Sequence, residues 1–564
     1  MTGGVLLPLP ALLLLGALWL AGLAASRWRR LRCRRPGLTG EWAALGALAA
    51  LNLGFFWRVL LTRDTWLPRG GGDFNSFYYP LYSFAARRIA AGDFPLWNPH
   101  LWGGMPFAAD QQTGLFSPIN LLAFVVARPF TYGTLEWLAI GHVWLASALA
   151  YAYCRELGCR RAPAVIGGVT YAYSGFMVAH LGHYPMVAVA AWLPAVLLAL
   201  RRAILRASLG WTLALAGATL LALLGGHQQI VLYVLVAAGL SWLFLTARTS
   251  PAAHWPAGVG QVGRWLRKPF AAHWLRCAGQ LALALGLAAG LAAPALLPSL
   301  QLARRSIRAG LSYQESTAFA LRPLHLVTLL APNALGTTPT TYISALDFSG
   351  EVFGYAGVVA LGLAALAFAL PLGRRRADAL YLGALGLLAL LVALGPWTPV
   401  QGWFYAFAPG FSRVRASGRW LLLVDFAVAM LAALGADQLL RLLGRAGAAA
   451  LAPLLRRMAI GLGALLGVGL LALLVLYGAL LAPKDPPAPL AQFLDSAAAL
   501  LFFAGLGLLV VLALWRGRLG ARPAAAVLCG LVVLDLFAAT APIPPTNADP
   551  LAGYRHDEAL AALR

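Results

Sequence analysis

Candidate catalytic residues are concentrated in the polar stretch from Gly70 to Asn120, which interrupts an otherwise apolar sequence. This stretch combines carboxylates with amides, a histidine and many aromatic rings. Carboxylates and amides hydrogen-bond to hydroxyl groups, and aromatic rings stack on apolar ring faces, so the mixture suits a site for a sugar or a phosphate. The alternative is a membrane-interface loop, where Trp and Tyr are also enriched. The residues of this stretch that we predict to bind substrate are Asn75, Tyr79, Trp97, Asn98, His100 and Gln111.

Asp73 is the candidate catalytic base. It follows three glycines, whose backbone can bend closely around a ligand, and Asn75 crowds the same position. A carboxylate there would act as a general base or as a ligand of a divalent metal ion; the alternative is a solvated loop carboxylate. Asp110 lies in a similar turn bracketed by glycine and proline and is the second candidate acid. Asp93 is instead expected to begin a turn by bonding its own backbone.

Two histidines at the ends of apolar runs are further candidates. His183 and His227 have glycine and polar neighbours, including Gln228, and we predict that these three residues line the same cavity as the polar stretch. The alternative for each histidine is an ordinary hydrogen-bonding residue at the membrane interface. The spacing of His180 and His183 permits one helical face, but without a nearby third ligand it gives little support to a zinc site.

Arg415 and Arg419 are candidates for binding a phosphate. They are four residues apart, which is one helical turn if the next apolar helix begins there. Guanidinium groups form paired hydrogen bonds to phosphate oxygens, so both arginines could address one phosphate. The alternative is that these side chains extend to ordinary lipid headgroups.

The composition indicates a membrane protein with many spans. The chain has 564 residues, of which 61% are hydrophobic and 11% charged, and its mean hydropathy is +0.76. Water-soluble globular proteins do not reach such values. The net charge of +24 is better explained by cytoplasmic loops that follow the positive-inside rule than by nucleic-acid binding. None of the five cysteines falls in a predicted outer loop, so no disulfide framework is implied.

About 14 apolar runs are long enough to cross a bilayer, which takes about 17 to 25 residues. We therefore expect an all-α polytopic membrane protein. The predicted spans are 4–25, 41–62, 134–154, 164–180, 185–200, 210–226, 229–247, 277–299, 353–372, 379–395, 419–439, 458–482, 497–515 and 523–541.

Charge fixes the predicted orientation of these spans. The first run has no basic residue before it and the segment RWRRLRCRRP directly after it, the reverse of a signal peptide, so it is expected to remain as an anchor with the N-terminus outside. Alternation from there assigns to the cytoplasm the loops that begin near residues 26, 155, 201, 248, 373, 441 and 516. These loops hold most of the lysines and arginines although they are mostly short. The polar stretch and both termini are then outside.

This topology divides the chain into four parts. Residues 1–62 form the N-terminal anchor and the first helix of the bundle, and residues 63–133 form an extracytoplasmic catalytic loop with interfacial helices. Residues 134–541 form the transmembrane bundle, with outer loops near 300–352 and 396–418. Residues 542–564 form a short extracytoplasmic tail.

The distribution of polar residues separates three classes of function. A transporter or flippase is expected to place them near the membrane midplane in broken helices, whereas an enzyme concentrates them in outer loops, as here. Asp425 and Asp535 are carboxylates inside apolar runs; a proton relay would favour a transporter, but without partners in the same spans they are expected to bond neighbouring helices. The third class, a scaffold in envelope assembly, would need no clustered carboxylates.

The chain resembles the YfhO-like bacterial membrane proteins, members of the GT-C superfamily of glycosyltransferases that use polyprenyl-phosphate sugars. The resemblance covers most of the chain and rests on the order of its motifs: GGD followed by YYP, then GDFPLWNPHLWGGMPF, ADQQTGLFSPINLL, GGHQQ, DFSGEVFGYAG and RVRASGR. Relatives usually have proline where Ser417 stands, and they often continue into a soluble outer domain, whereas here only a short tail follows the last span.

The resemblance implies a fold and an activity. The fold would be a GT-C-like helical bundle with a large first extracytoplasmic loop, in the bacterial cytoplasmic membrane with the active site facing outside. The donor would be a polyprenyl-phosphate-linked sugar, and the acceptor a cell-envelope glycopolymer, glycolipid or protein. Asp73 matches the acidic residue that activates the acceptor or binds metal in GT-C enzymes, and Arg415 and Arg419 match an arginine pair suited to the lipid phosphate.

Overall fold

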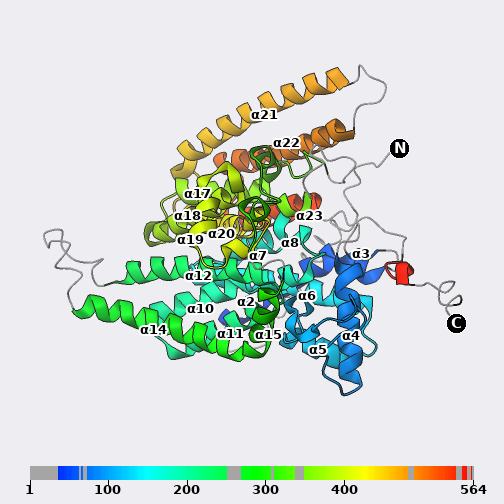
Figure 1. Ribbon diagram of the computed structural model, residues 1–564. Helices are drawn as coiled ribbons and strands as arrows, with labels where there is room; N and C mark the ends of the chain where they lie inside the picture. The colour runs from blue at the N-terminus through cyan, green and yellow to red at the C-terminus, as the bar shows by residue number, and fades with distance from the viewer. Residues whose placement is uncertain are drawn as a thin grey trace.

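The protein is built of helices throughout the part that its computed structural model describes (Figure 1). Over these residues there is no β-strand, and Asn98 and Met105 pair only as an isolated antiparallel bridge. The predicted anchor at 4–25, the glycines at 70–72, Arg308, the loop near 483 and most of the tail lie outside the described residues. The structure describes residues 36–62, 65–67, 73–250, 268–306, 310–336, 349–480, 488–540, 549–554 and 561.

Ten helices in the described part are long and apolar enough to cross a membrane, which confirms the prediction of an all-α polytopic membrane protein. Two of the ten are interrupted, so that α7 continues as α8 and α9 as α10. The ten are α6 (Tyr132–Glu156), α7 (Arg161–Ala172) with α8 (Gly175–Ala179), α9 (Tyr184–Ala190) with α10 (Leu193–Arg206), α12 (Gln228–Thr249), α14 (Lys268–Leu291), α18 (Arg376–Ala393), α20 (Leu421–Ala446), α21 (Ala452–Leu480), α22 (Ala488–Trp515) and α23 (Ala521–Thr540).

Three more predicted spans correspond to helices outside that group. The run at 41–62 is α2 (Pro36–Phe55) followed by α3 (Trp57–Leu61). The runs at 210–226 and 353–372 are the shorter apolar helices α11 (Leu209–Leu223) and α17 (Val358–Ala369). The remaining helices of the described part are α4 (Tyr79–Ala90), α5 (Pro118–Val126), α15 (Ala293–Arg304), α16 (Tyr313–Ser316) and α19 (Pro399–Phe407).

Loops assigned to the cytoplasm meet at one end of the bundle and are joined by ion pairs. Asp437, which is fully buried, accepts from Arg160 at 3.0 Å, from Arg375 at 2.6 Å and from Arg441 at 2.5 Å. The loops near 155, 373 and 441 are thereby held together, as the predicted alternation requires. The other ion pairs at this end are Arg155–Glu41, Arg161–Glu41, Arg202–Glu156, Arg201–Asp378 and Arg248–Asp378.

Helix α20 is the centre of the bundle. It packs against α7, α17, α18 and α23, and its membrane-length window is 89% buried. A side chain at Gly435 would meet the backbone of α17, because a Cβ atom there would lie 1.9 Å from the carbonyl oxygen of Leu363. Small residues at such a contact allow two membrane helices to pack closely. By contrast, α21 lies at the edge of the molecule with only 6% of its window buried (Figure 1).

The two intramembrane acids bond neighbouring helices, as expected. Asp425 of α20 accepts from the backbone N–H of Phe176 at 3.1 Å and so caps α8, the continuation of the interrupted helix α7. Asp535 of α23 accepts from the hydroxyl of Tyr355 and from the backbone N–H of Val359 at 2.9 Å, at the start of α17. Both carboxylates therefore satisfy helix N-termini that lie within the apolar bundle.

Candidate functional site

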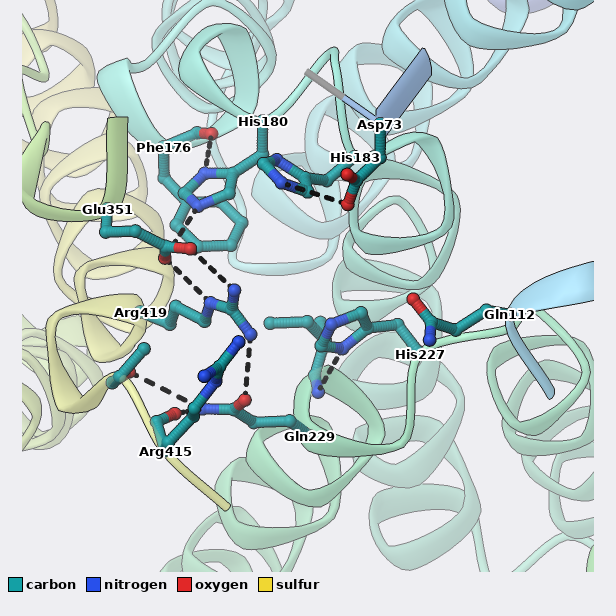
Figure 2. Close-up of polar contacts among 12 residues, drawn as sticks. Asp73, Gln112, Phe176, His180, His183, His227, Gln229, Glu351, Arg415 and Arg419 are labelled. Carbon is teal, nitrogen blue, oxygen red and sulfur yellow. Dashed lines mark hydrogen bonds and ion pairs between the residues drawn. The ribbon is translucent and has the colours of Figure 1, made fainter. Parts of the chain in front are cut away.

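An ion pair between Glu351 and Arg419 forms the centre of a polar cluster (Figure 2). Glu351 lies in the 3₁₀ segment Ser349–Val352, and Arg419 lies in the 3₁₀ segment Ser417–Trp420 that leads into α20. Arg419 Nε and Nη2 donate to the two carboxylate oxygens at 2.7 and 2.5 Å, and Nη1 donates to Gln229 Oε1 at 3.0 Å. The side chains are only 12% and 7% exposed, so the pair is fixed in orientation by its surroundings.

Arg415 reaches the same cluster from the other side of a backbone turn. Ala416 has a left-handed conformation with φ of 61°, and Gln229 Nε2 donates to the carbonyl oxygen of Arg415 at 2.5 Å. The helix-like backbone begins only at Ser417, so Arg415 and Arg419 are not one turn apart on a helix, which differs from the expectation. Figure 2 shows the Arg415 side chain pointing toward the Arg419 guanidinium.

The two arginines differ in whether a carboxylate neutralises their charge. Arg415 is exposed, and its side chain makes no hydrogen bond or ion pair with any residue that the structure describes. Arg419 is neutralised by Glu351, whereas the charge of Arg415 is not. The cluster thus carries an uncompensated positive charge at its open side, and a phosphate is the kind of ligand that such an arrangement binds well.

Asp73 faces His183 across the cluster. The Asp73 carboxylate, which begins the π-helical turn Phe74–Tyr78, lies 3.6 Å from Nε2 of His183, which directly precedes α9. The Asp73 side chain is 51% exposed, so a ligand can reach it. His183 Nδ1 is buried and has no hydrogen-bond partner among the described residues. A proton on Nε2 is therefore favoured, because that nitrogen faces the carboxylate.

His180 connects the two halves of the cluster. Its Nδ1 lies 2.8 Å from the carbonyl oxygen of Phe176, and its Nε2 lies 3.3 Å from Glu351 Oε2. Both ring nitrogens thus face oxygen atoms of the cluster. The rings of His180 and His183 are 5.9 Å apart between centroids. A continuous series of polar side chains therefore extends from Asp73 to Arg419 (Figure 2).

Tyr78 and Gln112 close the side of the cluster next to the polar stretch. The buried Tyr78 hydroxyl donates to Gln112 Oε1 at 3.2 Å, and Figure 2 shows Gln112 beside His227. Burial raises the pKa of Tyr78, and the negative charges of Asp73 and Asp110 raise it further. This tyrosine is therefore a neutral hydrogen-bonding group at every physiological pH.

The ionisable groups of the cluster have shifted pKa values. Burial lowers the pKa of His227, and the charge of Arg419 lowers it further. Burial, followed by the charge of His180, likewise lowers the pKa of His183. Burial opposes ionisation of Glu351, but hydrogen bonds from Arg419 and His180 outweigh it and hold the pKa of this carboxyl well below its usual range. His183 and His227 are thus neutral and Glu351 is ionised at neutral pH.

Five of the predicted site residues are brought together in this cluster. They come from separate segments, which the fold assembles near the start of α20, whereas the buried Asp437 lies toward the far end of that helix. Gln229 was missed in favour of its neighbour Gln228, which is exposed at the start of α12. The five residues are Asp73, His183, His227, Arg415 and Arg419.

Other predicted residues of the polar stretch have structural roles next to the cluster. Asp110 accepts from the backbone N–H of Gln112 at 3.0 Å and so caps the short segment that carries Gln112. The carbonyl oxygen of Gln111 packs against Gly226, where a Cβ atom would lie 2.9 Å away. The carbonyl oxygen of Asn75 accepts from the hydroxyl of Tyr554 at 2.6 Å. The ring of Tyr79 packs against that of Tyr132 at 5.5 Å between centroids.

Three predicted substrate-binding residues lie on a separate turn after α4. Asn98 is buried and pairs with Met105, and its side chain accepts from the backbone N–H of His100 at 3.0 Å. The ring of His100 packs edge-on against Phe84. Trp97 is 53% exposed and lies over Gly104. These contacts form the turn itself, and none of them joins the cluster around Arg419.

Sequence reasoning missed several residues of the cluster. Glu351 lies in the motif DFSGEVFGYAG, where an outer acid between glycines was the available signal, and His180 was considered only with His183 as a possible zinc ligand. Tyr78 and Gln112 lie within the polar stretch, beside residues that were selected. No helix phase could be read at the start of α12, so the sequence did not distinguish Gln229 from Gln228.

The residues that the structure describes do not form a group of three or more His, Cys, Asp or Glu side chains that could hold a metal ion. Asp73 has one such neighbour, His183, on its inner side. Metal binding by Asp73 therefore has no additional support from the geometry of the described residues.

Comparison with known proteins gives a likeness of fold. No protein-family model matches the chain, and no curated protein matches it. It is similar to two crystal structures of ArnT from Cupriavidus metallidurans, one bound to undecaprenyl phosphate (TM-score 0.40) and one in the apo state (TM-score 0.44). In each comparison the sequences are 15% identical, and the match covers 88% of this chain and 77% of the ArnT chain. Membership of the YfhO-like family stays a prediction.

Proposed function

We propose that this protein is a membrane glycosyltransferase of the GT-C type. It moves a sugar from a polyprenyl-phosphate donor to a cell-envelope acceptor on the outer face of the bacterial cytoplasmic membrane. The observation that carries this proposal is the cluster itself, in which an accessible carboxylate, Asp73, lies across from the uncompensated guanidinium of Arg415. These are the two groups that transfer from a phosphate donor to a hydroxyl requires: a base and a phosphate-binding cation.

The arginines would hold the donor phosphate. Arg415 is available to pair with phosphate oxygens, and Arg419, fixed by Glu351 and Gln229, presents a second guanidinium in a set orientation. Negative charge grows on the phosphate as the bond to the sugar breaks, so preorganised positive charge lowers the barrier. A phosphate is already a good leaving group and needs less acid assistance than the alkoxide that glycosidases expel.

Asp73 would act on the acceptor. It removes the proton from the acceptor hydroxyl while that oxygen bonds to the anomeric carbon and the bond between that carbon and the phosphate oxygen breaks. A single displacement inverts the configuration at the anomeric carbon. His183, with Nε2 toward the carboxylate, holds Asp73 in orientation and stays neutral, so it does not reduce the basicity of Asp73 as a cation would.

The series of side chains between Asp73 and Arg419 would fix the position of the acceptor relative to the donor phosphate. Besides burial and the charge of His180, the charges of both Asp73 and Arg419 act on the pKa of His183, so these two groups are close enough to influence the same side chain. An acceptor at Asp73 and a phosphate at Arg415 would then be held at the same time, which supplies the proximity that group transfer needs.

The test is an assay of the purified protein with polyprenyl-phosphate sugars, with release of lipid phosphate as the readout. Asp73→Asn keeps the size of the side chain but removes its charge, and it should lower turnover by about 10²–10⁴-fold. Asp93→Asn is the control, because Asp93 is a half-exposed acid paired with Arg88 on the turn after α4. Absence of release by the wild-type protein, or equal turnover of the two variants, would contradict the proposal.

One observation favours the alternative of a transporter or flippase. Helix α7 is interrupted before α8, and broken helices with a buried acid are common in transporters. The acid at this break is Asp425, and one of its carboxylate oxygens already accepts a hydrogen bond from the backbone N–H of Phe176. Accumulation of a lipid-linked precursor in sealed vesicles, without release of lipid phosphate, would favour transport over transfer.

A further inference from the structure

A cavity lies away from the arginine cluster, between α22, α23 and the segments that carry Asn333 and Tyr355. Its volume is about 200 Å³. The lining includes Tyr355, whose hydroxyl donates a hydrogen bond to the fully buried Asp535. Its polar lining residues are Asn333, Tyr355, Gln492, Asp495, Ser496 and Asp535.

One face of α22 provides six of the thirteen lining residues. Gln492, Asp495, Ser496, Ala499, Leu500 and Phe503 recur at the helical spacing of three and four residues, so they form a single stripe along the helix. The stripe is polar near the start of α22 and apolar farther along. From Gln492 to Phe503 it extends about 16 Å at about 1.5 Å per residue.

This change of polarity matches an amphiphile that enters from the membrane. The polar part of the stripe is at the helix end predicted to be outside, at the depth of lipid headgroups, and the apolar part lies at the depth of acyl chains. Part of the remaining surface of α22 is covered by α21 and part is open: Phe502 and Leu509 are 53% and 61% exposed. Figure 1 shows α22 beneath the outermost helix α21, and only 22% of its membrane-length window is buried, so a lipid can approach the cavity sideways.

The acidic and amide side chains of the lining determine which lipid headgroup the cavity can bind. The lining contains two carboxylates and no Lys, Arg or His among the described residues. Asp495 is exposed and makes no hydrogen bond or ion pair with the described residues, whereas both oxygens of Asp535 are used. Carboxylate and amide oxygens accept hydrogen bonds, so they favour a headgroup that donates them and repel an unshielded phosphate.

We propose that this cavity binds the headgroup of an outer-leaflet amphiphile that donates hydrogen bonds through hydroxyl or ammonium groups, with its chain along Ala499 and Phe503. This inference does not rest on the glycosyl transfer proposed above. The arginine cluster would hold an anionic phosphate, whereas this cavity would reject one. The chain would then have two lipid sites of opposite charge preference at the same face of the membrane.

The test measures binding to the purified full-length protein by native mass spectrometry. Three lipids with the same acyl chains are compared: a glucosyl diacylglycerol, phosphatidylethanolamine and phosphatidic acid. We expect at least one of the first two to bind at least tenfold more tightly than phosphatidic acid. A preference for the glucosyl lipid identifies hydroxyl donors, and a preference for phosphatidylethanolamine identifies the ammonium group.

Matched variants locate the binding. Ala499→Phe fills the cavity and should weaken binding at least tenfold, whereas Ala498→Phe places the same side chain on the adjacent, non-lining position of α22 and should leave binding unchanged. Asp495→Asn should weaken binding of the ammonium lipid more than that of the glucosyl lipid. Equal binding of phosphatidic acid, or equal behaviour of Ala499→Phe and Ala498→Phe, would overturn the inference, and neither outcome depends on enzymatic activity.

Discussion

Arg415 and Arg419 show how two identical residues four positions apart can differ in role. Arg419 makes three hydrogen bonds to Glu351 and Gln229, and it is largely buried. Removing one partner of a buried ion pair leaves the other charge uncompensated, which typically costs about 3–5 kcal/mol. Arg419→Ala would therefore change stability as well as donor binding. Arg415 contributes only its backbone carbonyl to the fold, so its side chain is free for a ligand.

The first prediction uses this difference. Arg415→Ala should weaken use of the polyprenyl-phosphate donor at least tenfold, seen as a raised KM for the donor, while the KM for the acceptor and the midpoint of thermal unfolding stay close to wild type. Arg413→Ala is the control, because Arg413 is also exposed, lies two residues earlier and is not part of the cluster. If Arg415→Ala and Arg413→Ala raised the KM for the donor equally, Arg415 would act only by adding positive charge to this surface and not by binding the phosphate.

The second prediction concerns pH. His183 and His227 have lowered pKa values in the folded protein, whereas unfolded histidines take up a proton near about pH 6.5. The unfolded state then binds more protons, so stability falls as the pH drops below about 6.5, by up to about 1.4 kcal/mol per pH unit for each histidine. Glu351, with its lowered pKa, adds a further loss only below about pH 4.5, its unfolded value.

Thermal unfolding in detergent from pH 7.5 to pH 5 measures this effect. His227→Gln keeps an acceptor for the backbone N–H of Ile230, which caps α12, and should give a shallower dependence on pH than the wild type. His100→Gln, on the turn after α4 and outside the cluster, serves as the control for the loss of a histidine. The same slope for His227→Gln and the wild type would mean that His227 is not held neutral by the fold.

The sequence predicted some residues of the cluster because their chemical type is rare where they occur. Arginine is depleted at outer helix ends, and aspartate directly after three glycines is uncommon, so Arg415, Arg419 and Asp73 could be selected. The partners of Arg419 could not be predicted, because Glu351 and Gln229 lie 68 and 190 residues away along the chain and reach it only through tertiary packing. Trp97 and His100 were selected for composition, and their local contacts form a turn instead.

At the scale of elements, α17 packs on α20 with almost no space between the two backbones. Gly435→Ala would place a methyl group against the backbone of Leu363, which cannot move aside as a flexible side chain could. Overpacking of this kind typically costs about 1–3 kcal/mol. We expect Gly435→Ala to lower the midpoint of thermal unfolding clearly. Gly461→Ala on the exposed helix α21 has open space around it and should leave the midpoint unchanged or slightly raised.

Apolar runs predicted the elements well because a membrane span must be long, apolar and internally hydrogen-bonded. The interruptions of α7 and of α9 were not predicted, since each pair forms one apolar run in the sequence. At the first of these breaks the cause is tertiary: Asp425 of α20 caps α8 from a distance of 249 residues along the chain. The first predicted span and the glycines at 70–72 lie outside the described residues, so what the sequence indicates for them stays a prediction.

At the scale of the whole molecule, acids and arginines are arranged differently at the two ends of the bundle. At the end predicted to face the cytoplasm, Asp437 and Asp378 are each surrounded by arginines that join the loops. At the other end, charged side chains form the cluster around Arg419, where Asp73 and Arg415 stay accessible. One end therefore uses its charges to fix the loops, and the other keeps charges available for a ligand.

The last prediction tests which end faces outside. In a variant whose five native cysteines are changed to alanine, single cysteines are placed at Gly72, beside Asp73, and at Arg518, in the exposed loop before α23. Because positive loops remain in the cytoplasm, a membrane-impermeant thiol reagent added to intact cells should label Gly72→Cys and not Arg518→Cys. Lysis should make Arg518→Cys equally reactive, which shows that its protection came from the membrane. Labelling of Arg518→Cys alone in intact cells would show that the predicted orientation is reversed. The cluster would then face the cytoplasm, and a donor in the outer leaflet could not reach it.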